Sequence, residues 1–401
     1  MDLSSGYPYF LIKTGLPFNY QKLEASLKTD VLILGGGISG ALTAYYLTSA
    51  GINCVVIDSR GIGLGSSAAS TSLLQYELDT SLVTLINKVG KANAVNAYQL
   101  CVEAINKLGK LSDKIGNRDF EFKQSLYYAA TKKDVSFLKN EFAVRKENGL
   151  DVSYLNGSDI NSKFGFTAPG AILSATAGQT DCYMLTHSLH QSAIKKGLKV
   201  YDNTSIVKID HGKRSIAAVA ENGCIIKAKK IVYATGYEVM HLIDKKIVTF
   251  NSTYACASEQ QNNQTKLWKD DVLLWNTADP YLYLRSTNDK RIIIGGRDEK
   301  FYDPNKRDKL LKRKTKQLAK DFKELFPAIP FKPEFSWTGT FGVTKDGLPF
   351  IGQYKKLPNS FFALGFGGNG IVFSLIAAEI LQDIFLGKKS KSAPIFSFER
   401  L

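Results

Sequence analysis

A glycine-rich segment at residues 30–58 has the pattern of a strand, a tight turn, a helix and a second strand in succession. The apolar strand runs into Gly35, Gly37 and Gly40, which have the spacing GxGxxG, and Gly51 ends the helix. The first glycine permits the turn, the second lets the backbone approach a pyrophosphate, and the third lets the helix pack closely on the strand. The free N–H groups and the positive end of the helix dipole then bind the phosphates. We therefore predict a Rossmann-like unit that binds a dinucleotide.

The residues after this turn indicate which dinucleotide is bound. Asp58 ends the second strand, where its carboxylate can accept both ribose hydroxyls of an adenosine. A 2′-phosphate would meet a like charge there, so NADP is disfavoured although Arg60 is near. Residues 59–77 are rich in small and hydroxyl-bearing side chains, which favours FAD because a flavin stays extended along such a backbone; a glycine–serine linker is the alternative. The cofactor-binding residues predicted from this segment are Gly35, Gly37, Ile38, Ser39, Gly40, Asp58, Ser59, Arg60, Gly65, Ser66, Ser67, Ser70 and Thr71.

Length and composition indicate a globular chain of two domains. It has 401 residues, of which 44% are hydrophobic. The five cysteines occur singly and the four histidines lack the spacing of a metal site, so we expect no metal and a reduced, cytoplasmic location. The longest apolar stretch, residues 371–386, is interrupted by Glu379, Gln382 and Asp383, and the first residues lack the pattern of a secretory signal. We therefore expect no membrane span.

The chain is basic, with 52 lysines and arginines against 37 acidic residues and a net charge of +15. Most of the lysines are spread along the sequence, apart from short runs such as residues 306–316. A solvated helix face explains such a run, and attraction to an anionic partner such as RNA is the alternative. We expect no nucleic-acid partner, but the charge alone leaves both interpretations open.

The order of the expected elements predicts an α+β fold with an α/β nucleotide-binding part. The glycine-rich unit comes early, strands dominate residues 246–298, and a helix after another glycine-rich segment closes the chain. We expect a discontinuous Rossmann-like FAD-binding domain, with an inserted substrate domain that contains a mixed or antiparallel sheet. The predicted boundaries are 28–95, 152–246 and 342–390 for the FAD-binding domain, 96–151 and 247–341 for the substrate domain, and 1–27 for an N-terminal extension.

Five segments resemble, in their order along the chain, those of the D-amino-acid-oxidase-like FAD oxidoreductases. They are "DVLILGGGISG", "VIDSRGIGLGSSAAS", "IVYATGYE", "DGLPFIG" and "LGFGGNGIVFSLIAAEIL". That superfamily includes glycine oxidase, sarcosine oxidase and gamma-glutamylputrescine oxidase, and the last branch looks closest. The resemblance implies that the final helix starts at the flavin, and that FAD is held non-covalently because Gly339 stands near the position of the linking cysteine of sarcosine oxidases. The further cofactor contacts that it implies are Val207, Ala234, Thr235, Gly236, Gly339, Gly367, Gly368, Asn369, Gly370 and Ile371.

The resemblance also implies a chemistry, in which the C–N bond of an amine or amino-acid derivative is oxidised by hydride transfer to flavin N5. The resulting imine hydrolyses to a carbonyl compound. Glycine-oxidase-like members bind the substrate carboxylate with two arginines, and the corresponding positions here are Phe341 and Gly368. Without a bidentate anchor, an amine that lacks a free α-carboxylate is the expected substrate. The candidate substrate-pocket residues are Tyr283, Arg285 and Tyr254, with Trp275 as a weaker one and a sheet-surface ladder as the alternative for the first two.

Two other functions stay open from the sequence. The superfamily contains an oxidase domain that acts on a modified tRNA base, which would suit the positive charge, and a non-catalytic FAD-binding protein that relays electrons is the other alternative. The lysine that favours reaction with oxygen in sarcosine oxidases is replaced by an aliphatic residue near Ile293. The electron acceptor is therefore O2 or an unidentified molecule, and the sequence indicates no oligomeric state.

Overall fold

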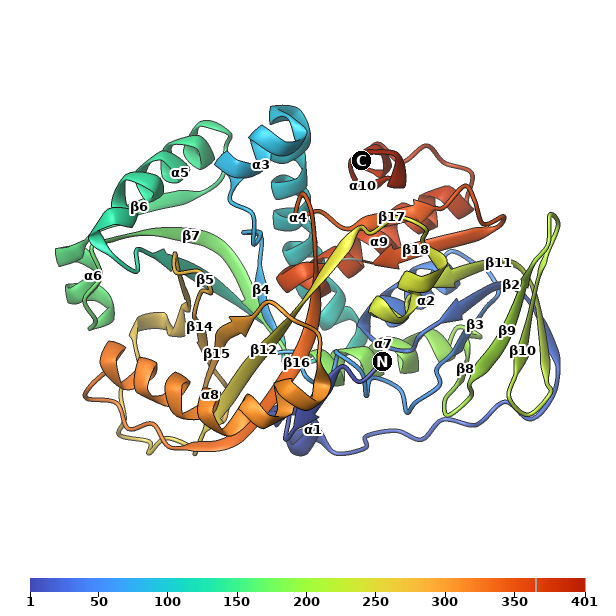
Figure 1. Cartoon of the computed structure of the whole chain (residues 1–401), viewed down its shortest axis with the longest axis horizontal. Helices are drawn as coiled ribbons and strands as arrows, with labels where there is room; N and C mark the ends of the chain where they lie inside the picture. Colours follow the sequence, from blue (N-terminus) through green and yellow to red (C-terminus); the bar gives the residue numbers. More distant parts are fainter. Residues whose placement is uncertain (365, 401) are drawn as a thin grey trace.

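The computed structural model describes residues 1–364 and 366–400, and its strands form two large sheets that lie side by side (Figure 1). The smaller one has eight strands and the larger one has ten. Helices pack on both sheets and between them. This arrangement confirms the predicted class, a Rossmann-like part joined to a second part with a mixed sheet.

The eight-stranded sheet contains the glycine-rich unit. Its order is β17 (Phe350–Gln353), β18 (Ser360–Leu364), β11 (Ile225–Tyr233), β2 (Leu27–Leu34), β3 (Cys54–Ile57) and β8 (Lys199–Tyr201), with β10 (Ile216–Ala220) beside β11 and β9 (Ile206–His211) beside β10. From β18 to β8 the neighbouring strands run parallel. Parallel strands covered on both faces are nearly continuous apolar runs, and residues 31–34 and 54–57 are all buried.

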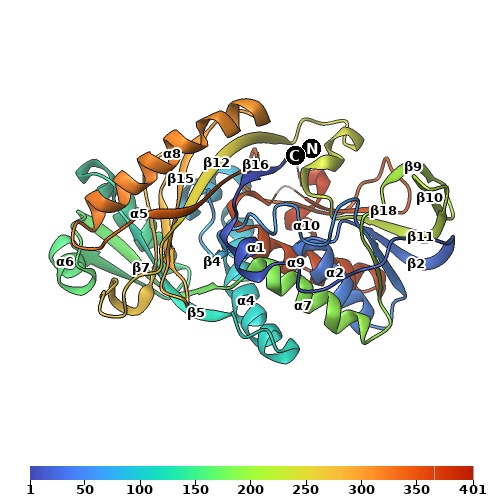
Figure 2. The same ribbon diagram turned by 90° about the horizontal axis from the view of Figure 1, so that it is seen from below.

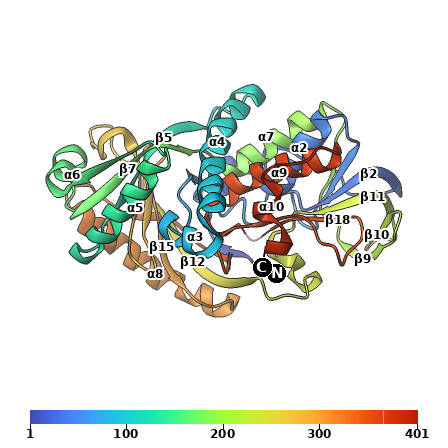
Figure 3. The same ribbon diagram turned by 90° about the horizontal axis from the view of Figure 1, so that it is seen from above.

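Helices α2 (Ile38–Ser49), α7 (Cys182–Ile194) and α9 (Gly370–Phe385) pack together on one face of this sheet (Figure 2). The hydroxyl oxygens of Ser39 and Ser374 lie 2.7 Å apart and join α2 to α9. Helix α4 (Lys91–Ile115) lies against α9, between the two sheets (Figure 3). The start of α9 is thereby fixed close to the start of α2.

The ten-stranded sheet forms the other half of the molecule. Its order is β1 (Ser4–Gly6), β16 (Pro333–Thr344), β12 (Val248–Ser258), β15 (Ile292–Glu299), β14 (Tyr283–Ser286), β13 (Leu273–Asn276), β5 (Glu121–Tyr128), β7 (Gly170–Gln179) and β4 (Leu73–Gln75), with β6 (Val152–Asn156) beside β7. The pair β13–β5 is parallel and the other pairs are antiparallel. The sheet is therefore mixed, as predicted.

Helix α8 (Pro304–Leu325) runs along one face of the ten-stranded sheet (Figure 2). It carries the basic run 306–316, and it buries Leu318 and Phe322 against the sheet. It also buries Arg307 and Lys314, so part of the basic run packs inside the protein rather than facing solvent. The shorter helices are α1 (Tyr9–Thr14), α3 (Leu82–Val89), α5 (Val135–Glu147), α6 (Gly157–Phe164) and α10 (Ala393–Phe396).

Two segments that the predicted boundaries assign to the FAD-binding domain contribute strands to the ten-stranded sheet. Strands β6 and β7 pair with the ten-stranded sheet, because β7 is in antiparallel register with β5, so the predicted segment 152–246 is split between the two sheets. Strand β4, within the predicted segment 28–95, also belongs to the larger sheet. Alternating apolar residues show that a strand is half-buried, but they do not identify the sheet that it joins.

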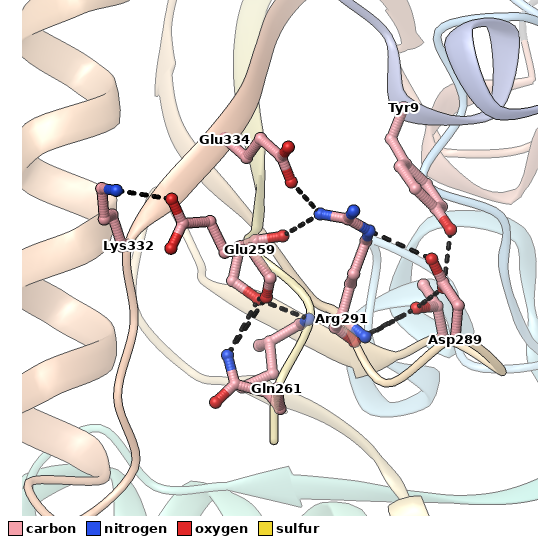
Figure 4. Close-up of polar contacts among 10 residues, drawn as sticks. Tyr9, Glu259, Gln261, Asp289, Arg291, Lys332 and Glu334 are labelled. Carbon is pink, nitrogen blue, oxygen red and sulfur yellow. Dashed lines mark hydrogen bonds and ion pairs between the residues drawn. The ribbon is translucent and has the colours of Figure 1, made fainter. Parts of the chain in front are cut away.

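The N-terminal extension is bound to both halves. Strand β1 pairs with β16, and Gln21 forms a bridge with Tyr201 at the edge of the smaller sheet. A polar network connects α1 to the larger sheet (Figure 4). The Tyr9 hydroxyl donates to Asp289 at 2.6 Å, and Arg291 donates to the other oxygen of Asp289 at 3.0 Å.

One helical stretch among the described residues, Gly367–Phe385, is long and apolar enough to meet the criteria for a membrane span. In its most apolar window 61% of the residues are buried inside the protein, where the helix packs on α2, α4 and β17. It therefore has the packing of a core helix.

Candidate active site

A cavity of about 640 Å³ lies between the two sheets. Its walls come from the turn between β2 and α2, from residues 57–79, from strands β9, β12 and β14, and from the start of α9. This volume is typical of small-molecule and cofactor sites. Segments far apart in the sequence therefore meet around one hollow.

The β2–α2 turn has the close backbone approach that its glycines predict. Gly35 has φ of +101°, and a Cβ on it would lie 2.4 Å from the carbonyl oxygen of Ala234. A Cβ on Gly40 would lie 1.8 Å from the carbonyl oxygen of Gly35, so neither position has room for a side chain. Gly40 packs behind the turn and does not line the cavity, which corrects the prediction of a direct cofactor contact there.

The Asp58 carboxylate is fixed at the end of β3 by two backbone donors. The N–H of Gly36 donates to it at 2.7 Å, and the N–H of Arg60 donates at 2.9 Å. Burial raises the pKa of Asp58, and these two hydrogen bonds oppose that rise. The Arg60 guanidinium pairs with Glu238 at 3.2 Å, and Glu238 also binds the N-terminal ammonium of Met1. Arg60 therefore has its own carboxylate partner.

The start of α9 faces the same cavity. The Asn369 amide donates to the backbone carbonyls of Gln75 at 2.9 Å and Glu77 at 2.8 Å, which connects this helix start to residues 73–79. The helix is 16 residues long, so its first N–H groups and its dipole favour negative charge at this end. Gly365, part of the glycine-rich segment predicted here, lies outside the described residues.

Most of the predicted cofactor-binding residues line the cavity. These are Gly35, Gly37, Ile38, Ser39, Asp58, Ser59, Arg60, Gly65, Ser66, Ser67, Ser70, Thr71, Val207, Ala234, Thr235, Gly236, Gly339, Gly367, Gly368, Asn369, Gly370 and Ile371. Val207 is 64% exposed, so it lies at an edge of the cavity. These features fit FAD. They are a turn with no room for side chains at its first and third glycines, a carboxylate placed to accept hydrogen bonds from ribose hydroxyls, and the start of a helix.

Of the candidate substrate residues, Tyr283 and Tyr254 line the cavity. The Tyr254 hydroxyl is buried without a hydrogen-bond partner in the described part of the chain, and burial raises its pKa to about 12. Burial also raises the pKa of Tyr283. Tyr283 is therefore neutral near pH 7 and can donate a hydrogen bond to a ligand. The Tyr254 ring lies on the opposite face of the sheet, where it packs against α8 with the Lys314 ammonium 5.3 Å from its centre, so its predicted role as a substrate ligand does not fit the structure.

Arg285 does not line the cavity, and its predicted role as a substrate ligand does not fit the structure. Its guanidinium donates to the backbone carbonyls of Thr71, Ser72 and Thr180 at 2.9–3.2 Å. Arg285 shares a strand face with Tyr283, but it lies about 7 Å further along the strand, where these carbonyls cover it. It serves as an interior crosslink between β14 and the segment before β4.

The structure adds residues that sequence reasoning missed. Asp79 and Asp298 line the cavity near Tyr281. Trp275, the weaker of the candidates predicted from the sequence, lines the same end. No motif marked Asp79. The pair Gly295–Gly296 before Asp298 was a usable signal, because glycines inside a strand often mark a bulge.

Among the described residues, no group of His, Cys, Asp or Glu side chains could hold a metal ion. His190 lies in α7, and its Nε2 is 3.1 Å from the carbonyl oxygen of Gly36. Burial lowers the pKa of His190 to about 4, so the ring is neutral and supports the glycine turn.

Comparisons with known proteins agree with this geometry. The family model described as DAO, FAD dependent oxidoreductase, matches residues 30–384. The putative Rieske 2Fe-2S iron-sulfur protein YhfW of Bacillus subtilis is 24% identical and covers 98% of this chain and 75% of its own length. The gamma-glutamylputrescine oxidoreductase of Escherichia coli is 20% identical and covers 92% and 86%. The crystal structure of L-proline dehydrogenase from P. horikoshii has a TM-score of 0.77 at 20% identity and covers 94% and 99%.

Proposed function

The chain belongs to the DAO family of FAD-dependent oxidoreductases, and from that membership we propose that it oxidises the C–N bond of an amine that carries no free α-carboxylate. FAD is its cofactor, and amines or amino acids are its substrate class. We also propose a cytoplasmic location, which the five free cysteines support.

The observation that carries the proposal is the absence of an anion anchor in the described walls of the cavity. Phe341 and Gly368 line it at the two positions where the family resemblance puts carboxylate-binding arginines. Arg60 is the only arginine among the described lining residues, and it pairs with Glu238 beside Asp58. A substrate carboxylate would lose its water and find no bidentate partner.

When bound, FAD accepts a hydride from the carbon next to the substrate nitrogen. The β2–α2 turn and Asp58 hold the dinucleotide, and the start of α9 stabilises negative charge at its end of the cavity. Tyr283 keeps its proton and orients the amine. Buried Trp275 and the half-buried Phe341 exclude water while the C–N bond is oxidised, and the released imine then takes up one water to give a carbonyl compound and an amine.

The test is an anaerobic titration of the purified yellow holoenzyme, with loss of the visible flavin absorption as the readout. We expect primary or secondary amines to reduce the flavin, and glycine, sarcosine and D-alanine to reduce it poorly. Reoxidation by air or by an artificial dye then identifies the class of electron acceptor. Reduction by simple amino acids alone contradicts the proposal. Reduction by no amine contradicts it too, and directs attention to an electron relay or a tRNA-modifying flavoprotein.

A further inference from the structure

One end of the cavity carries negative charge where a carboxylate-binding site would carry positive charge. Asp79 lies against Gly368, whose N–H donates to Asp79 Oδ2 at 2.9 Å, and the Tyr281 hydroxyl donates to Asp79 Oδ1 at 2.8 Å. A Cβ on Gly368 would lie 2.9 Å from Asp79 Oδ1. An acid therefore occupies the space beside the position that corresponds to an arginine.

A β-bulge brings a second acid to this end. Between the pairs Tyr254↔Gly296 and Ser252↔Glu299, strand β12 contributes one residue and β15 contributes two, Arg297 and Asp298. Gly296 has φ of +131° and Arg297 has φ of +58°. Bulges of this kind redirect side chains and are frequent beside functional sites, and here Asp298 lines the cavity.

Helix α8 holds this bulge in place. Arg297 donates to Asp321 at 2.8 Å, and the Lys314 ammonium donates to the backbone carbonyl of Arg297 at 2.7 Å. Lys314 also pairs with Glu299 at 2.6 Å. The nearby cation thus has two other partners, while Asp298 Oδ1 is buried without a hydrogen-bond partner among the described residues.

Buried carboxylates without a counter-ion are costly, and the groups around Asp298 do not supply one. Burial and the negative charge of Asp79 raise the pKa of Asp298 to about 7, while a hydrogen bond from Thr253 and the charge of Lys314 oppose the rise. Tyr281 and Tyr283 face the same acid as neutral phenols. The place for a cation is therefore the cavity itself.

Three aromatic rings complete the walls at this end. The Trp275 and Tyr281 ring centres are 6.0 Å apart at 78°, and those of Tyr281 and Tyr283 are 5.9 Å apart at 54°. The Trp275 ring is also stacked on Tyr127 at 3.7 Å, which fixes its orientation. Aromatic faces next to carboxylates are the surroundings that proteins use for ammonium groups.

We propose that Asp298 and Asp79, with the rings of Trp275, Tyr281 and Tyr283, bind a second, protonated nitrogen of the substrate. The substrate is then a diamine or a longer polyamine, in which one nitrogen is held as an ammonium ion and the carbon beside the other nitrogen is oxidised. This inference rests on the proposed function and narrows it to a dicationic substrate class.

Tetramethylammonium tests this subsite without turnover, because it has no oxidisable neutral nitrogen. Its dissociation constant for the oxidised holoenzyme is measured from the change in the flavin spectrum, and tert-butanol serves as a neutral probe of similar size. We expect the cation to bind and the alcohol not to perturb the spectrum. Asp298→Asn should weaken cation binding by about tenfold to a hundredfold, the usual effect of losing a bond to a charged group.

Glu299→Gln is the matched control, because it removes the same charge one residue further along β15, where the side chain pairs with Lys314 and does not line the cavity. It should change the dissociation constant by less than about twofold. If the Asp298→Asn protein retains no FAD, Asp79→Asn takes its place. Equal binding in wild type and variant, or no binding of the cation to wild type, overturns the inference.

A second measurement separates this inference from the proposed function. 1,4-Diaminobutane and 1-aminobutane are compared as anaerobic reductants of the flavin. We expect the half-saturating concentration of the diamine to be lower than that of 1-aminobutane by about tenfold or more. Asp298→Asn should remove this difference. If the two amines act equally well, the ammonium subsite is wrong and amine oxidation stands. If neither amine nor a longer polyamine reduces the flavin, the proposed function itself fails.

Discussion

At the residue scale, the glycine turn gives a direct prediction about cofactor affinity. Gly37 faces the cavity, and a Cβ there would lie 3.0 Å from the Ser67 hydroxyl, which accepts a hydrogen bond from the Ile38 N–H. A shift of that one side chain lets Gly37→Ala fold, but the added methyl group should hold the pyrophosphate away from the backbone. We expect the affinity for FAD to fall by about tenfold or more, which is about 1.4 kcal/mol. Gly51→Ala is the control, because no atom lies within 4 Å of its Cβ position and its φ of +80° costs only stability. Fluorescence titration of the apoproteins with FAD measures both, and equal affinities would contradict the geometry.

A second residue-scale prediction concerns pH. Asp298 has a pKa of about 7, raised mainly by burial, and only its ionised form attracts a cation. Below that pH the dissociation constant of tetramethylammonium should therefore fall by about tenfold for each unit of rise, and it should level off above it. The flavin spectral titration is repeated between pH 5.5 and pH 8.5, with Asp298→Asn as the control that should lose the dependence. A flat profile in the wild type would show that another group binds the cation.

The residue scale also shows how far sequence reasoning reaches. The glycines of the first turn and Asp58 were predictable, because each acts through its own backbone or through the end of its own strand. Arg285 was placed wrongly, since the carbonyls that bind it come from segments far away in the sequence. Asp79 lies in no motif, and its role depends on contacts with Gly368 and Tyr281 that only the folded chain brings together.

At the element scale, the attachment of α1 depends on the network of Figure 4. Arg291 binds Asp289 at 3.0 Å and the carbonyl of Ser258 at 2.8 Å, and it also pairs with Glu334. Arg291→Met should lower the free energy of unfolding by about 1–3 kcal/mol, because it leaves half-buried acceptors without their charged donor.

The matched control for this network is Lys332→Met. Lys332 pairs with Glu259 at the surface, where its side chain is 77% exposed, so its loss should leave the free energy of unfolding nearly unchanged. Urea unfolding measures both variants, and limited proteolysis reports whether cleavage before residue 16 becomes faster in the first variant. Equal stability and unchanged cleavage would show that the apolar packing of Tyr9 and Phe10 alone holds α1.

Helices and strands were predictable where their own sequence pattern determines them. They were less predictable where their position depends on which strand they pair with. The opening strand–turn–helix unit and the mixed second sheet follow from local signals, such as apolar runs and glycine turns. The pairing of β7 with β5 and β4 is decided by surfaces that the fold creates, so residues 152–179 joined the other sheet. The bulge in β15 had a local signal in its two glycines, but its consequence, an acid inside the cavity, required the position of β12.

At the scale of the whole molecule, the cavity lies between the two sheets, so bound FAD should contact both and stabilise their association. Its walls combine the β2–α2 turn of the smaller sheet, β12 and β14 of the larger sheet, and the start of α9. With free FAD at a hundred times its dissociation constant, the cofactor should add about 2.7 kcal/mol to the free energy of unfolding. Hydrogen exchange should locate the effect, with greater protection in holoprotein than in apoprotein at residues 35–40, 65–79, 233–242 and 367–371. Helix α6 and strand β6 contribute no lining residue among those described, so their exchange should stay the same. Protection confined to the smaller sheet would show that the second half of the wall does not close on the cofactor, and the positions of Tyr283 and Asp298 would then not define the substrate site.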